Sequence, residues 1–106
     1  MLPLAAEAKL SAPRACTATL TGADLAMVAA TAGIGVKIWQ VVLEGTATDP
    51  IVLKNGTTTQ VTIRVPANAS AVLPFSGSPW AFADAGNALN VNGAATTIAT
   101  LYYTQD

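Results

Sequence analysis

Residues 51–65 read IVLKNGTTTQVTIRV, and this stretch is the clearest sign of the fold class. From Val61 to Val65 every second residue is apolar, which is the period of a half-buried strand. Asn55-Gly56 stands just before that strand and is the strongest short hairpin signal, because both central positions of a type I′ turn need positive φ. We therefore predict a hairpin of two antiparallel strands, residues 51–54 and 60–65.

The segment before this hairpin, residues 36–44 (VKIWQVVLE), is rich in β-branched and aromatic residues and is also predicted to be a strand. Both of its faces are apolar. We expect Val36, Ile38 and Val42 on one face and Trp39, Val41 and Leu43 on the other. Only one face can cover the core, so this strand is predicted to be central or to lie at an interface.

In the rest of the chain, the spacing of glycine, proline and asparagine residues is typical of short strands separated by turns. Residues 25–31 contain alanines that suit a helix, but the run is short and glycines follow it, so a strand is predicted there. Asn92-Gly93 is expected to be a second turn that pairs the strands on either side of it, and residues 76–87 are expected to form a long loop. The further predicted strands are residues 15–20, 71–75, 88–91 and 96–104. Together these elements predict an all-β fold, an antiparallel β-sandwich or jelly roll of about eight short strands.

The chain has 106 residues, which is enough for one domain. We assign residues 14–106 to this domain and residues 1–13 to an N-terminal arm. The arm carries Leu2, Leu4 and Leu10 among alanines and could be a short helix or an extended segment. Either form would be marginal alone in water, so the arm is expected either to lie against another surface, such as a neighbouring subunit, or to be a frayed terminus. Its sequence, MLPLAAEAKLSAPRA, has no basic start and is not expected to be a secretory signal.

The composition argues against several classes of function. Without histidine the chain has no imidazole base or metal ligand, and its single cysteine cannot form an internal disulfide or a cysteine-rich zinc site. Five lysines and arginines at a net charge of −1 give no footprint for nucleic acid, and no apolar run is long enough to cross a membrane. We therefore expect a protein that is not an enzyme and has no cofactor. Only 10% of residues are charged, against about 25% in ordinary domains, which favours self-association or docking on a partner.

Individual residues leave alternatives open. Trp80 and Phe82 could stack on sugar rings or anchor a protein interface, but we expect one or both of them to close an open end of the sandwich. Cys16 is expected to be a small buried hydrophobic residue. The acidic residues near turns (Glu44, Asp49 and Asp84) lack the close spacing of a calcium site. Tyr102 and Tyr103 should face opposite sides of the last strand, one inside and one toward a rim or partner.

From Val36 onward the chain resembles small structural proteins of tailed bacteriophages. The resemblance has three parts: a strand like VKIWQVVLEG, a hairpin like IVLKNGTTTQVTIRV, and the stretch AVLPFSGSPWAFADAGNALNVN before a closing strand with a tyrosine pair. Its most telling features are VLPF at residues 72–75, the aromatic Trp80, and the G-x-A-L pattern at residues 86–89.

This resemblance implies a jelly-roll protein that forms a homotrimer on the capsid exterior and contacts the major capsid protein. A decoration (cement) protein is expected rather than a fibre tip, because only a short arm precedes the domain. The alternative is a fibre or spike tip module that binds a receptor or carbohydrate. We expect Trp39, Val41 and Leu43 to contribute to the trimer contact, and the arm to reach the capsid or a neighbouring subunit.

Overall fold

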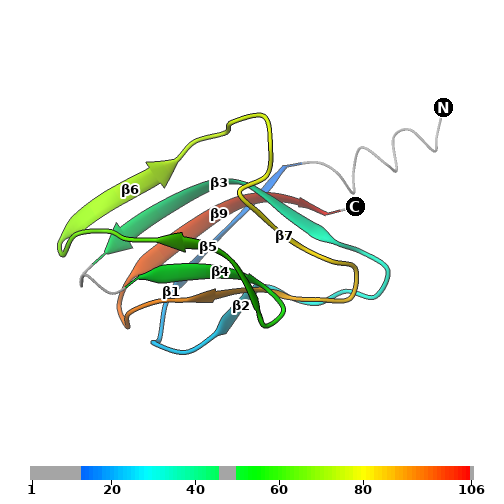
Figure 1. Ribbon diagram of the computed structural model, residues 1–106, viewed down its shortest axis with the longest axis horizontal. Coiled ribbons are helices and arrows are strands. Elements are labelled where there is room, and N and C mark those ends of the chain that lie inside the picture. Colours follow the sequence, from blue (N-terminus) through cyan, green and yellow to red (C-terminus); the bar gives the residue numbers. More distant parts are fainter. Residues whose placement is uncertain (1–12, 46–49, 106) are drawn as a thin grey trace.

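The computed structural model describes residues 13–45 and 50–105, and these residues form nine β-strands. The strands are β1 (Arg14–Thr19), β2 (Leu25–Val28), β3 (Val36–Gly45), β4 (Ile51–Asn55), β5 (Thr58–Ile63), β6 (Ala69–Leu73), β7 (Ala81–Ala83), β8 (Leu89–Asn92) and β9 (Ile98–Gln105). All pairs are antiparallel, and the two sheets they form pack face to face (Figure 1). The predicted β-sandwich is confirmed.

The strand order follows a jelly roll. The first sheet runs β1-β9-β3-β6, with β7 also paired to β3, and the second sheet runs β2-β8-β4-β5. β6 pairs with residues 41–45 of β3 and β7 with residues 36–38, so β6 and β7 follow one another along the same edge of β3 (Figure 1). Counted as one interrupted strand, they give two four-stranded sheets between which the chain crosses repeatedly.

The interrupted edge corrects one sequence expectation. Residues 76–87 were expected to be a loop, but β7 lies within them. Its first and last residues, Ala81 and Ala83, are buried with 2% and 3% of their surface exposed, while Phe82 between them is exposed. Two alanines bury too little apolar surface to stand out as a strand in the sequence, although the alternation is there.

The predicted hairpin between β4 and β5 is confirmed, with its turn displaced by one residue. Asn55 pairs with Thr58, so the two-residue loop is Gly56-Thr57, and only Gly56 of these has positive φ, at 58°. A glycine at the first central position is typical of a type II′ turn, not the type I′ turn expected. A bulge shifts the register between Leu53 and Lys54. The shift leaves Asn55 in the strand.

The second predicted turn is wrong. β8 belongs to the second sheet and β9 to the first, so the strands on either side of Asn92-Gly93 do not pair with each other. Gly93 is instead buried at the crossing between the sheets. A Cβ atom there would lie 2.7 Å from Cδ1 of Leu20 and 3.1 Å from Cγ1 of Ile51, so this position needs glycine for space.

β3 explains which apolar residues reach the core. Its pairing with β9 shifts register between Ile38 and Gln40, where an extra residue bulges out. A bulge inverts the alternation that follows it. Val41 and Leu43 therefore join Val36 and Ile38 in the core, each with 1% exposure or less, whereas Trp39 stays half-buried. The expectation that Val41 and Leu43 lie on an outer face is wrong for this reason.

Candidate interaction face

The exposed large apolar side chains gather on one side of the molecule. In the described parts of the chain they are Val72, Phe75, Phe82, Ile98 and Tyr102, with exposed fractions from 37% to 64%. Four of them belong to β6, β7 and β9 of the first sheet, and their sequence neighbours point into the core. The fifth, Phe75, lies in the connection between β6 and β7. We call this outer surface of the first sheet the apolar face.

Register places further uncharged residues on the same surface. Val42 of β3 pairs with Val72 of β6 and with Thr100 of β9, so these three residues form a row across the sheet. Thr100 also shares a hydroxyl hydrogen bond of 2.9 Å with Thr17 of β1. This uncharged row extends the apolar face from β6 across β3 and β9 to β1, while Lys37 and Glu44 of β3 lie on the same outer surface toward its ends.

An aromatic groove lies at one end of the apolar face. It has a volume of about 360 Å³ and is lined mainly by Trp39, Phe75, Tyr102, Tyr103 and Pro13. The rings of Trp39 and Phe75 lie 5.7 Å apart between centroids, tilted by 44°. The indole N–H of Trp39 donates a 2.8 Å hydrogen bond to the Thr104 hydroxyl, which fixes the ring and leaves the groove nearly free of unpaired polar atoms. Such a groove suits an apolar occupant.

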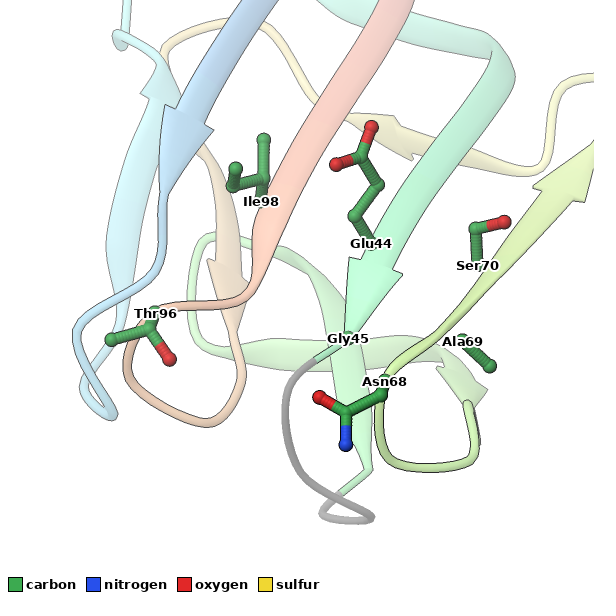
Figure 2. A pocket seen from close by; sticks show the side chains of 7 residues that line it. All are labelled: Glu44, Gly45, Asn68, Ala69, Ser70, Thr96 and Ile98. Carbon is green, nitrogen blue, oxygen red and sulfur yellow. The ribbon is translucent and has the colours of Figure 1, made fainter.

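The opposite end of the apolar face holds a polar pocket of about 420 Å³ (Figure 2). Its floor is a row of Ile98, Glu44 and Ser70, which register places side by side on β9, β3 and β6. Asn68 and Thr96 rise from the turns at either side (Figure 2). Among the described residues that line it, Glu44 is the one that carries a charge.

The two turns that wall this pocket have unusual backbone geometry. Within residues 13–45 and 50–105, Asn68 and Thr96 are the non-glycine residues with positive φ, at 58° and 74°. Asn68 sits in a turn closed by the Ala69 amide on the Pro66 carbonyl at 3.2 Å, and the Thr96 amide donates to the Leu20 carbonyl at 3.0 Å. A β-branched residue at positive φ costs about 1–3 kcal/mol, so the surrounding bonds hold these walls in place.

The outer surface of the second sheet has a different character. Lys54 of β4 contacts both carboxylate oxygens of Asp24, at 3.1 and 3.2 Å, and Asn92 of β8 donates to the same carboxylate at 2.7 Å. Asn90 donates to the Gly56 carbonyl. The Asn92 hydrogen bond, followed by the Lys54 contacts, lowers the pKa of Asp24 below its ordinary value. This polar face is suited to water, and the molecule is therefore two-sided.

The other predicted site residues fall as follows. Trp80 packs against the core and its indole N–H donates to the Pro74 carbonyl at 2.8 Å, which agrees with a role in closing the sandwich. Phe82 lies on the apolar face. Tyr102 is exposed while Tyr103 packs against the core, as the alternation predicted. Leu2, Leu4 and Leu10 lie outside the described residues.

Phe75, Val72 and Ile98 are the residues of this face that the sequence interpretation missed. Phe75 and Val72 lie in AVLPF, where residues 71–75 are predicted only to be a strand. A signal was present: Pro74 ends the pairing, so the apolar residue after it has no strand to turn it into the core. Val72 stands between the half-buried Ala71 and Leu73, and alternation around that pair places it outside.

The described part of the chain offers little other chemistry. It holds no group of three or more cysteine, aspartate or glutamate residues that could bind a metal, and no helix long and apolar enough to cross a membrane. Burial, partly offset by a hydrogen bond from the Leu101 backbone, raises the pKa of the Cys16 thiol. No protein-family model, curated protein or solved structure matches this chain.

Proposed function

We propose that this chain is a structural protein of a bacteriophage particle, a decoration protein that forms a trimer on the capsid exterior. The observation that carries the proposal is the apolar face, which collects the five exposed large apolar side chains on one sheet. Contiguous exposed apolar surface marks interaction sites in soluble proteins. The jelly-roll strand order and the sequence resemblance to small phage proteins support the same reading.

The contrast between the apolar face and the polar face suits a decoration protein. A decoration protein needs one surface that excludes water against its neighbours and one that stays hydrated outside the particle. The apolar face suits the first requirement and the Asp24-Lys54-Asn92 face suits the second. In a trimer each contact occurs three times, so modest contacts combine into firm retention on the shell.

The solution mass of the chain, measured by light scattering on a sizing column, is the first test. We expect three times the 10.7 kDa chain mass. Phe75→Ser and Trp39→Ala should reduce that mass, because Phe75 is 64% exposed and rests on the Trp39 ring. A mass unchanged in both variants would show that the aromatic groove does not take part in the trimer.

Binding to the particle is tested separately by mixing the chain with capsid shells of its source phage and sedimenting them. Co-sedimentation at a fixed ratio to the major capsid protein is expected. Chain that stays in the supernatant at every concentration would contradict the decoration role, whatever the oligomeric state.

A receptor-binding tip module is the second candidate. The aromatic groove favours it, because Trp39, Phe75 and Tyr102 present ring surface on which a sugar could stack. Quenching or a shift of tryptophan fluorescence on adding glycans, with no binding to shells, would favour this candidate over the first.

A further inference from the structure

Two opposite charges lack partners in the described part of the chain. Glu44, on the floor of the polar pocket, and Arg64, in the connection after β5, take part in no ion pair or side-chain hydrogen bond with another described residue. Other cations are engaged: Lys54 contacts Asp24, and Arg14 donates to Gln105 at 3.0 Å. On a chain with so few charges, an unpaired cation and an unpaired carboxylate form a complementary pair of surfaces.

From this arrangement we infer that the polar pocket receives Arg64 of a second copy of this chain. The pocket offers hydrogen-bond acceptors in the carboxylate of Glu44, the amide of Asn68 and the hydroxyl of Ser70 (Figure 2). A guanidinium group has five N–H donors and no acceptor, so it matches this set better than an ammonium group does. Ile98, 37% exposed, covers the aliphatic stem of the arginine.

The position of Arg64 in the fold allows it to reach the polar pocket of a second copy of the chain. Ile63 and Val65 on either side of it are half-buried and buried, so Arg64 points outward. The connection that carries it leads from β5 of the second sheet to Asn68, which is itself a wall of the pocket. Donor and pocket are therefore close along the chain, and each can face a different neighbour. A contact between two different patches of identical subunits closes into a ring when the rotation permits.

The pocket is also prepared for an occupant. Asn68 and Thr96 hold left-handed backbone conformations, and the Ala69 and Thr96 amides fix their turns through the Pro66 and Leu20 carbonyls. The backbone of these two residues therefore pays little ordering entropy on binding. The pocket lies on the same surface as the aromatic groove, so one neighbouring copy can bury both ends of the apolar face.

This inference rests on the trimer of the proposed function, and charge reversal tests it. Glu44→Arg and Arg64→Glu should each raise the concentration at which the trimer dissociates by about tenfold or more, since each places like charges together. The double variant, Glu44→Arg with Arg64→Glu, should return that concentration to within about threefold of the unmodified chain. Circular dichroism verifies that each variant is folded, and light scattering over a dilution series gives the dissociation concentration.

Lys54→Glu is the matched control, because it makes the same change of net charge as Arg64→Glu but on the polar face. It should leave the dissociation concentration unchanged. A trimer that survives both single reversals overturns the inference and leaves the trimer proposal standing. Single variants that dissociate without rescue in the double variant also overturn it, because the two charges then act on different partners. An unmodified chain that is a monomer at every concentration overturns both.

Discussion

Gly93 shows how a single residue can be fixed by space alone. A Cβ at this position would meet the Leu20 and Ile51 side chains at 2.7 and 3.1 Å, inside the crossing between the sheets. Gly93→Ala should therefore destabilise the fold by about 1–3 kcal/mol, the usual cost of overpacking. Urea unfolding monitored by circular dichroism measures this. Gly77→Ala is the comparison: it has open space but a φ of 88°, and its smaller loss of about 1 kcal/mol reflects backbone strain.

Cys16 makes stability depend on alkaline pH. Its pKa is raised by burial, so the unfolded chain releases the thiol proton near the ordinary value of 9.0 while the folded chain still holds it. The folded state then binds more protons, and the free energy of unfolding falls as pH rises above about 9.0. Urea unfolding at pH 8 and pH 10 should show this loss. Cys16→Ser should reduce it, and an equal loss in that variant would assign the effect to another group.

At the scale of one element, β3 shows what alternation cannot predict. The residues VKIWQVVLEG indicate a strand by their composition. The bulge between Ile38 and Gln40, however, depends on the pairing of β3 with β9, a strand about sixty residues away in the chain. The side chains before the bulge were assigned to the correct face. The assignments after it were reversed. The local sequence pattern thus predicts that a strand is present, while a long-range contact decides which of its residues face the core.

This reversal predicts a difference between adjacent valines. Val41→Thr places a hydroxyl in the core, where Val41 is 0% exposed, and should cost about 1–3 kcal/mol. Val42→Thr makes the same chemical change on the apolar face, beside Thr100, and should cost less than about 0.5 kcal/mol. Thermal and urea unfolding of the two variants gives the comparison. Equal costs would mean that β3 is not bulged where the register shift places it.

An Asn-Gly pair predicted a hairpin turn correctly only where the two strands on either side of it are neighbours in one sheet. Asn55-Gly56 joins β4 and β5 of one sheet, and the hairpin was found with an error of one residue. Asn92-Gly93 has the same residue pair, yet it leads from one sheet to the other. The sequence cannot distinguish the two, because the φ of the glycine differs only through tertiary contacts: Gly56 has positive φ, while Gly93 is retained for its lack of a Cβ.

At the scale of the whole molecule, the two-sidedness of the sandwich was only partly visible beforehand. The low charge indicated a surface that needs covering, but the location of that surface depends on which strands share a sheet. Val72 and Tyr102 are 30 positions apart along the chain and meet on one face only because β6 and β9 flank β3. Such a face is a property of the topology.

The difference between the apolar face and the polar face predicts that the same substitution will affect self-association on one face and not on the other. Val72→Lys puts a charge in the middle of the apolar face, at a residue that is 54% exposed, so the fold should tolerate it. Burying that ammonium against a neighbour carries a desolvation cost, and the trimer should dissociate on dilution. Ala26→Lys adds the same charge to the exposed surface of β2, at the edge of the second sheet opposite the strand that leads to Arg64. The solution mass should remain that of the trimer, because the polar face stays in water. Light scattering on both variants at equal concentration decides the matter. Dissociation caused by Ala26→Lys alone would place the subunit contact on the second sheet and exclude the apolar face as the interface.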